Sequence, residues 1–564
     1  MAKTEKTTKA KTEKNAELLE GKLKAIQTAM GQIEKKYGKG SVSTVDPIEP
    51  SEPIVGDSTD IVLAYSTYTV SNDTENHFII GVADPNYPLY VNGVAVTDRT
   101  PKGYFSYYIK GLEVGKNEYI ITQNENSKTF TVTRAAQTSS STTMSEFGFI
   151  NSSFSPLNDY ANASGTKLTV SCTATAGAKV YATIGDYTVQ LSTSTSAATD
   201  GTFKKANYSG TFVLPEVEGN AVIGKVTFYA EKSGQKTVVK ELGNIVEVIN
   251  DPNSYVVSVT QNLCDLMGSL DDDPDEYYMA TLGATDGVVA KWGGNTKLKS
   301  GNFIANGNIE KIEGSLTEAI IPIMSTTQSV DGKYTEISFL TTSQMLHKIW
   351  MYDDRTEIIL YNVGSFPDNI SIPDNPLFSS VSYKKNGSTI TITLNHKESM
   401  HIFGYKPEFK SGQLVIGFKN PIALKDGDKP LTGIRISIDP GHSLNGGAVG
   451  PWGTVKWTEA DWNYELSFLV NEKLQALGAT TYLTHNRELI HDLDPIIEQF
   501  RAWEPDMNIS IHYNYVPDYA NPATAKGSET YYSFSSSKLL AKSVLDKFCE
   551  GTGFYNRGHK PGYY

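Results

Sequence analysis

The sequence predicts a multidomain protein in which β-sandwich modules are followed by a C-terminal α/β domain with a largely parallel sheet. Three observations predict this fold class. The chain has 564 residues, which is enough for several domains. Between about residues 61 and 430, short alternating runs are separated by turn residues, which is typical of antiparallel β-structure. From residue 431, apolar strands alternate with helices, and this order is typical of a parallel sheet.

The composition excludes several classes of protein. A formal net charge of −13 argues against a general nucleic-acid binder, so we expect no nucleic-acid partner. No run of about 18 apolar residues occurs, so no membrane span is predicted. The cysteines Cys172, Cys264 and Cys549 lie far apart, and we expect isolated thiols rather than a disulfide framework or a metal site.

The first 42 residues differ in character from the rest. Residues 1–42 are predicted to form a charged tail and an amphipathic helix, with Leu23, Ile26 and Met30 near helical spacing. The stretch KLKAIQTAMGQIEKKYGKGSV (22–42) resembles the N-terminal helix of the bacterial recombinase RecA. No phosphate-binding G-x-x-x-x-G-K-S/T loop occurs in the sequence, so we exclude a recombinase or ATPase function. We interpret this stretch as a short head from a fused or misjoined reading frame.

A linker and two β-sandwich modules are predicted next. Residues 43–60 are rich in Pro, Ser and Asp and form the linker. In residues 61–136, the run PLYVNGVAV contains Asn92-Gly93, which predicts a hairpin. This module resembles the small bacterial Ig-like modules of cell-surface enzymes. Residues 137–250 begin with a Ser/Thr-rich hinge and continue with strands such as KLTVSCTATAG, which are typical of a second sandwich.

Residues 251–430 are predicted to form a third β-rich region. The runs KIWMYDDRTEIILYNV and GSTITITLNH alternate in polarity as strands do. The acidic run DDDPDEYY (271–278) lacks the ligand spacing and glycine of a calcium loop. We therefore interpret it as a solvated loop.

The C-terminal domain, residues 431–564, is predicted from its alternating elements. Strands are expected at 434–438, 480–484, 507–511 and 529–534, and helices at 459–477, 491–503 and 537–549. The first helix carries an apolar stripe on one face, made of Trp462, Leu466, Leu469, Val470, Leu474 and Leu477. The last helix carries a similar set, made of Leu540, Val544, Leu545 and Phe548.

Two strands of this domain lead into histidines. One runs through Asp-Pro-Gly directly into His442, and strand 507–511 is followed by His512. A glycine-rich loop leads to Glu459, which begins a helix behind the predicted N-cap Thr458. Sites in parallel sheets form at the carboxyl ends of the strands, so we expect these three side chains to lie together. Two histidines and one carboxylate are the ligand set of a catalytic zinc site; on spacing alone, structural or surface histidines remain the alternative.

Five motifs carry a resemblance to a known family. IDPGH, EADWN, SIHYN, GSETYY and NRGHK occur in the order found in the zinc-dependent N-acetylmuramoyl-L-alanine amidases of type 3, which residues 434–564 resemble. The resemblance implies that zinc is the cofactor and that His442, Glu459 and His512 are its ligands. It also implies that the substrate is peptidoglycan, in which zinc-activated water cuts the amide bond between N-acetylmuramic acid and L-alanine.

The same resemblance implies roles for neighbouring residues. Asn463 and Asn514 match the asparagines that accompany the second and third ligands. Asp439 and Ser510 lie where they would orient the histidines. Residues interpreted as surface or structural rather than as ligands are His485, His491, His559, Arg487 and Arg501. The β-rich region 251–430 resembles the domains that precede amidases and help bind the cell wall.

The sequence departs from the family at the last motif. In the family the general-base glutamate lies in a final V-E-x-G-F motif, whereas this sequence stops at NRGHKPGYY. Glu529 is the nearest internal candidate for the catalytic base, although its strand is framework in the family. We therefore expect a C-terminally incomplete amidase domain; the alternative is a non-catalytic cell-wall-binding surface protein. The resemblances imply an extracellular or cell-wall location for the native parent protein, although no signal peptide is visible in this chain.

Overall fold

The computed structural model describes most of the chain from residue 60 to residue 562. The described residues are 60–136, 142–198, 202–262, 264–270, 277–398, 402, 404–442, 446–448, 458–484, 493–517, 519–524 and 526–562. The predicted N-terminal helix, the linker and most of the acidic run lie outside the described residues. The chain divides into two compact units, one up to Ala136 with Leu424–Ala525 and one of Gln137–Ala423 with the residues from Lys526 onward.

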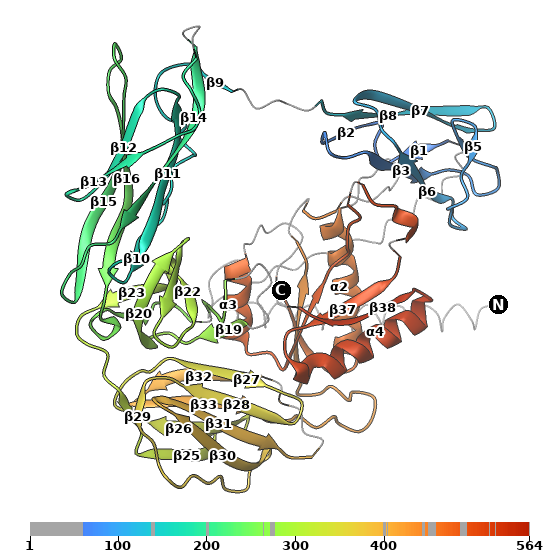
Figure 1. Cartoon of the computed structure of the whole chain (residues 1–564). Helices are drawn as coiled ribbons and strands as arrows, with labels where there is room; N and C mark the ends of the chain where they lie inside the picture. The colour runs from blue at the N-terminus through green and yellow to red at the C-terminus, as the bar shows by residue number, and fades with distance from the viewer. Residues whose placement is uncertain are drawn as a thin grey trace, which may run out of the picture. The chain divides into compact units, whose positions relative to one another are not determined.

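The first described module is a β-sandwich of two sheets (Figure 1). The three-stranded sheet has the order β1 (Val62–Leu63), β3 (Asn76–Val82), β6 (Tyr104–Lys110). The five-stranded sheet has the order β2 (Thr67–Val70), β8 (Asn126–Arg134), β7 (Gly115–Gln123), β4 (Tyr90–Val91), β5 (Val94–Ala95). Both sheets contribute to one core, with Ile79 and Phe105 from one and Ile121 and Phe130 from the other. The predicted hairpin is confirmed: β4 and β5 pair around Asn92 and Gly93, whose φ angles of 47° and 78° suit the tight turn.

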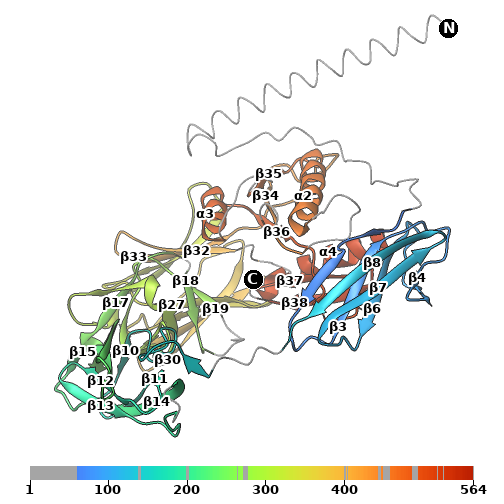
Figure 2. The same cartoon turned by 90° about the horizontal axis from the view of Figure 1, so that it is seen from above.

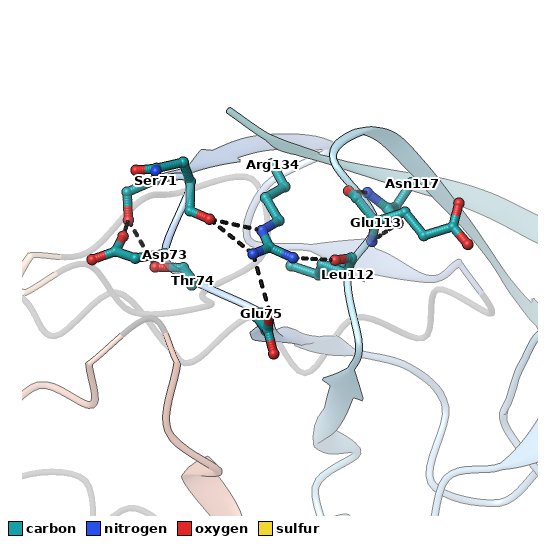
Figure 3. A network of polar contacts seen from close by, with 9 residues as sticks. Ser71, Asp73, Thr74, Glu75, Leu112, Glu113, Asn117 and Arg134 are labelled. Atoms are coloured by element: carbon teal, nitrogen blue, oxygen red, sulfur yellow. Dashed lines mark hydrogen bonds and ion pairs between the residues drawn. The ribbon is translucent and has the colours of Figure 1, made fainter. Parts of the chain in front are cut away.

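A partly buried arginine closes one end of this sandwich (Figure 3). The guanidinium of Arg134, at the end of β8, donates to the Asn72 carbonyl at 2.8 and 3.0 Å and to the Leu112 carbonyl at 2.8 Å. It also lies 3.3 Å from the carboxylate of Glu75, and its side chain is only 15% exposed. One side chain therefore holds two loops against the last strand of the module.

Arg134→Ala is expected to weaken this sandwich by about 2 kcal/mol, because it removes charge-assisted hydrogen bonds and leaves carbonyls without their donor. The measurement is hydrogen exchange of residues 60–136 in the full chain. Lys128→Ala is the matched control, because Lys128 is exposed on the same strand; its effect is expected to stay within about 0.5 kcal/mol. Equal acceleration of exchange in both variants would contradict the role assigned to Arg134.

The second sandwich occupies residues 142–249. Its strands are β9 (Thr143–Met144), β10 (Tyr160–Asn162), β11 (Lys167–Thr175), β12 (Lys179–Ile184), β13 (Tyr187–Leu191), β14 (Phe203–Val213), β15 (Asn220–Glu231) and β16 (Val238–Ile249). A three-stranded sheet, β11-β14-β9, faces strands β13-β12-β15-β16 across one core that includes Val170, Phe212 and Phe228.

The larger sheet of this sandwich continues past residue 250. β10 pairs parallel with β16 and antiparallel with β20, so strands from both sides of that residue share one hydrogen-bonded sheet. The added elements are η1 (Pro252–Ser254), β17 (Val256–Val259), β18 (Cys264–Met267), β19 (Tyr277–Ala280), β20 (Thr285–Trp292), β21 (Asn295–Leu298), β22 (Phe303–Ala305), η2 (Asn306–Asn308) and β23 (Ile309–Ile312). The domain border placed at 250 therefore stays a prediction.

Residues 319–419 form two four-stranded sheets and one two-stranded sheet around a shared core. Its strands are β24 (Ala319–Ile320), β25 (Ile323–Gln328), β26 (Tyr334–Leu340), β27 (His347–Met351), β28 (Arg355–Leu360), β29 (Val363–Ser365), β30 (Phe378–Asn386), β31 (Thr389–His396), β32 (Tyr405–Lys410) and β33 (Gln413–Lys419). The two four-stranded sheets have the orders β25-β26-β33-β32 and β27-β28-β31-β30. Phe339, Phe378 and Phe418 lie fully buried in the shared core.

In the region from residue 431, three strands form a parallel sheet. The order is β35 (Thr480–Leu483), β34 (Arg435–Pro440), β36 (Met507–Ile511). Helix α2 (Glu459–Ala476) packs against β34 and β35 (Figure 2), and α3 (Leu493–Trp503) connects β35 to β36. Ile436 and Ile438 of β34 form the core with Val470 and Leu474 of α2. The remaining elements are η3 (Pro522–Thr524), β37 (Ser528–Tyr532), η4 (Ser535–Ser537), α4 (Lys538–Thr552) and β38 (Asn556–Pro561), with β37 and β38 parallel.

Only part of the apolar stripe predicted for α2 is buried, because Val470 and Leu474 pack against the core whereas other members face solvent. Leu469 and Leu477 are 57% and 43% exposed. The most deeply buried residues of α2 are Glu459, Ala460, Asn463, Tyr464, Ser467 and Asn471. The helix is turned so that Glu459 faces inward, and the residues four and eight positions later share its side. A similar difference holds for α4, which buries Ala541 and Leu545 and leaves Leu540 exposed.

Two predictions from composition can be compared with the structure. Cys172, Cys264 and Cys549 are all free thiols, which confirms that they form no disulfide framework. Burial raises the pKa of the Cys172 thiol to about 12, so this thiol stays protonated and inert. Among the described helices, none has the length and apolar character needed to cross a bilayer.

Candidate metal centre

Three predicted ligands meet at one edge of the parallel sheet. His442 follows β34, Glu459 begins α2, and His512 follows β36. The Glu459 Oε1 atom lies 3.2 Å from His442 Nε2 and 3.1 Å from His512 Nδ1. The three ligand atoms lie within 4.8 Å of one another. The structure thus brings together side chains that are 17 and 53 positions apart in the sequence.

Glu459 is fixed by the start of its helix. Thr458 is the N-cap as predicted, and it forms a capping box with Asp461. The Glu459 side chain is only 6% exposed, and its two oxygens accept the backbone N–H of Ala448 at 3.0 Å and of Tyr513 at 3.1 Å. Burial alone would raise the pKa of Glu459. The Ala448 N–H, the charge of His442, the His512 hydrogen bond and the Tyr513 N–H together outweigh it and lower that pKa, so the carboxylate is ionised at neutral pH.

Gly441 and Gly447 allow the side chains of the three candidate ligands to lie close to the backbone of the loop. A Cβ on Gly441 would lie 2.2–2.5 Å from the ring atoms of His512. A Cβ on Gly447 would lie 2.6 Å from the Glu459 Cβ and 2.7 Å from the His442 Cδ2, and Gly447 has a φ of +78°. These two glycines therefore leave room for the side chains of the candidate ligands.

Asp439 links the ends of all three parallel strands. Its carboxylate accepts the hydroxyl of Thr484, after β35, at 2.7 Å and that of Ser510, on β36, at 2.7 Å. The resemblance implied that Asp439 and Ser510 orient the histidines, and this stays a prediction. Among the described residues their bond is to each other, so they act on the strand ends that carry His442 and His512.

Asn463 supports the centre from inside the helix. It is fully buried, and its Nδ2 donates to the Gly441 carbonyl at 2.7 Å, directly before His442. Its Oδ1 is buried with no hydrogen-bond partner among the described residues. His442 itself has a φ of +62°, a conformation that needs support from its surroundings. The hydrophobic pattern of α2 gave no sign of this inward amide, whereas the family motif did.

Asn463→Leu is expected to weaken zinc binding about tenfold, because supporting groups behind metal ligands typically contribute that much. Leu has a similar volume but cannot donate to the Gly441 carbonyl. The measurement is zinc affinity by competition with a chelating dye. Asn471→Leu is the matched control: Asn471 is on the buried side of the same helix, two turns later. Unchanged affinity in Asn463→Leu, or an equal loss in both variants, would contradict this role.

Glu529 lies on β37 in an ion-pair network. Its carboxylate is 7% exposed, lies 3.2 Å from Arg557 Nε, binds Lys560 Nζ and accepts the Tyr531 hydroxyl at 3.0 Å. Burial would raise the pKa of Glu529, but the Lys560 and Tyr531 hydrogen bonds and the two cations outweigh it and lower that pKa. A carboxylate with a lowered pKa is a weaker proton acceptor. Its assignment as the catalytic base stays a prediction.

Glu529→Gln is expected to lower the free energy of unfolding by about 2 kcal/mol at pH 7, because it leaves two cations without their anion. Since the folded-state pKa is lowered, this contribution is present above the unfolded value of about 4.3 and is lost as the pH falls through the folded value. Urea unfolding at pH 7 and pH 3 should show the difference from wild type shrinking with acid. Glu550→Gln, in an exposed pair with Lys547, should change stability little at either pH. A pH-independent difference for Glu529→Gln would contradict this account.

Other predicted residues are placed as follows. Arg501 lies in the last turn of α3 and His559 on β38, where its ring is 6.2 Å from that of Tyr532. Neither belongs to the ligand cluster. His485, His491 and Arg487 lie outside the described residues.

The donor set fits a zinc ion. Two imidazole nitrogens and one carboxylate oxygen converge, and the carboxylate is ionised. The side chains of His442 and His512 are 39% and 50% exposed, so the cluster is open to solvent on the histidine side. A centre with three protein ligands and one open side is the arrangement of catalytic rather than structural zinc.

The region that holds this cluster is similar to known amidases. Residues 436–564 match the protein-family model of N-acetylmuramoyl-L-alanine amidases. The region from residue 436 onward is an amidase-family domain. The N-acetylmuramoyl-L-alanine amidase LytC of Bacillus subtilis (strain 168) is 30% identical over 206 residues, which cover 34% of this chain and 39% of LytC. The match thus spans about two fifths of the length of that relative.

Two kinds of solved structure are similar to parts of this chain, namely amidases and tandem Ig domains. The catalytic domain of CwlV, an N-acetylmuramoyl-L-alanine amidase from Bacillus (Paenibacillus) polymyxa var. colistinus, is 26% identical, with 23% of this chain and 71% of that chain covered and a TM-score of 0.21. Tandem Ig repeats of Dlar are 14% identical, with 34% of this chain and 100% of that chain covered and a TM-score of 0.11. Because both TM-scores are low, we transfer no structural detail from them.

Proposed function

We propose that this protein is a zinc-dependent N-acetylmuramoyl-L-alanine amidase that hydrolyses the bond between N-acetylmuramic acid and L-alanine in peptidoglycan. The observation that carries the proposal is the cluster of His442, Glu459 and His512, inside the region that matches the amidase family. Peptidoglycan is the proposed partner, and the native parent protein is proposed to act outside the cell or in the cell wall.

The residues of the chain divide the work of this reaction. Zinc, when bound, polarises the scissile carbonyl and lowers the pKa of a water molecule toward 7. Glu459 supplies the anionic ligand, and its two backbone donors keep both oxygens oriented. The two histidines supply neutral nitrogen donors and leave their exposed side to the substrate. Glu529 is the candidate general base, and its ion pairs with Lys560 and Arg557 make its carboxylate a weaker proton acceptor.

The second candidate is a wall-binding protein without catalysis, and the engagement of Glu529 is the observation that favours it. In that case the centre would hold zinc and contact the glycan, but no bond would be cut. Hydrolysis by the Glu529→Gln variant at the wild-type rate would exclude Glu529 as the base.

The test is zinc content together with release of stem peptide from purified peptidoglycan, scored by new L-alanine amino groups. The protein is assayed as purified, after chelation, and after zinc is restored. One zinc per chain with release that disappears on chelation and returns with zinc supports the amidase. Zinc without release supports the wall-binding candidate, and no zinc binding overturns the metal centre.

A further inference from the structure

Aromatic residues lie close in the sequence to two candidate ligands of the metal centre. Trp462 lies on the first turn of α2, one turn after Glu459, and Tyr513 directly follows His512. The ring centroids of Trp462 and Tyr513 are 6.1 Å apart, and their planes meet at 48°. Tyr513 is 40% exposed and Tyr515 is 71% exposed. We call Trp462, Tyr513 and Tyr515 the aromatic corner.

The backbone of the aromatic corner is held by the same contacts that build the centre. The N–H of Tyr513 donates to Glu459 Oε1 at 3.1 Å, so the Tyr513 backbone is fixed while its ring stays partly in solvent. Trp462 accompanies Glu459 on a helix start that is closed by a capping box. Surfaces held in place before a ligand arrives lose less entropy when it binds.

Packing alone explains only part of this arrangement. Contact between Trp462 and Tyr513 accounts for two half-exposed rings, since aromatic pairs stabilise each other by about 0.5–1.5 kcal/mol. It does not account for Tyr515, whose ring is largely in solvent two residues further along. Tyr513 and Tyr515 are exposed one and three residues after His512, and exposed aromatic side chains near an open metal centre are typical of a ligand-binding surface.

The proposed reaction requires a sugar ring at this place. The scissile carbonyl belongs to the lactyl group, which is attached directly to the pyranose ring of N-acetylmuramic acid. When that carbonyl lies at the ligand cluster, the ring lies only a few bonds away. A pyranose presents C–H groups on its faces, which complement the negative faces of aromatic rings, and hydroxyls at its edge, which can bind tyrosine hydroxyls.

We propose that the aromatic corner binds the pyranose ring of the N-acetylmuramic acid whose amide is cut. This inference rests on the proposed function, since the position of the sugar follows from the bond that is hydrolysed. It assigns substrate recognition to side chains that the ligand set does not include. The peptide stem then extends from the opposite side of the scissile bond.

The test uses the full zinc-loaded chain and ligands that contain no scissile amide. Binding of N-acetylmuramic acid is compared with that of D-lactate, which carries the same carboxylate without the sugar, by calorimetry. Wild type is expected to prefer the sugar ligand. Tyr513→Ala and Tyr515→Ala should each reduce that preference by about three- to tenfold, at unchanged zinc content. Tyr513→Phe keeps the ring and should restore most of it.

Tyr555→Ala is the control, because Tyr555 is 72% exposed and belongs to the compact unit that does not contain the three candidate ligands; it should leave the preference unchanged. Absence of any sugar preference in wild type, or its full retention in both alanine variants, overturns the inference. The binding measurement and the hydrolysis assay distinguish failure of this inference from failure of the proposed function. Release of stem peptide with an intact preference in the alanine variants would refute only the aromatic corner. A lost preference without any hydrolysis would leave the sugar site and refute the amidase.

Discussion

Glu459→Gln is expected to reduce both zinc affinity and stem-peptide release about a thousandfold or more. The substitution keeps the size of the side chain and removes its charge, and a neutral amide oxygen is a poor partner for zinc. The two backbone N–H groups of Ala448 and Tyr513 add a second cost. Each points at one Glu459 oxygen, so the amide NH2 of a glutamine must face one of these donors. Loss of the metal removes several kcal/mol of transition-state stabilisation, which sets the size of the effect.

Zinc content after dialysis and the rate of release measure this effect together. Glu472→Gln is the matched control, because Glu472 is exposed on the same helix; both quantities should stay at wild-type values. Thermal unfolding of the zinc-free proteins checks that Glu459→Gln still folds. One zinc per chain and normal hydrolysis in Glu459→Gln would show that this carboxylate is not a ligand.

Short sequence patterns predicted those turns and strands whose backbone conformation is determined by residues adjacent in the chain. The hairpin at Asn92-Gly93 was predictable because two residues with positive φ determine the turn. The joining of β10 to β20 was not predictable. Its single paired position, Ala161 with Lys291, connects residues 130 positions apart, and a strand of three residues carries almost no pattern of its own.

The buried face of α2 was also not predictable from the hydrophobic pattern, but for a different reason. Asn463 and Ser467 are fully buried, yet polar residues in an amphipathic pattern are normally assigned to the surface. α2 is oriented so that Glu459 is buried at the strand ends and Val470 and Leu474 pack against the core, while Leu469 of the predicted stripe stays exposed. The ligands themselves were predictable because each follows a strand or begins a helix. The family resemblance indicated a supporting role for Asp439, whereas its bond to Thr484 and the glycine contacts depend on three-dimensional packing that local sequence patterns do not predict.

Gly441→Ala is expected to weaken zinc binding about a hundredfold with little change in stability. The added Cβ would lie 2.2–2.5 Å from the His512 ring, so the ring must move away. The His512 side chain is 50% exposed and can turn into solvent at small cost. The backbone of Gly441 does not have a left-handed φ, so alanine fits it without strain. A ligand displaced by about 1 Å loses about a hundredfold in a positioned site.

Gly447→Ala makes a contrasting case in the same loop. Its Cβ would meet the Glu459 Cβ, which belongs to a buried side chain that cannot turn away, and φ is +78°. We expect stability to fall by about 1–3 kcal/mol together with the loss of zinc. Gly551→Ala, where a Cβ would have open space, should leave zinc affinity unchanged. Zinc titration measures the zinc affinity of the three variants, and urea unfolding measures their stability. A loss of affinity alone indicates a displaced ligand, whereas a loss of both indicates a strained loop. Tight zinc binding by Gly441→Ala would place His512 outside the ligand set.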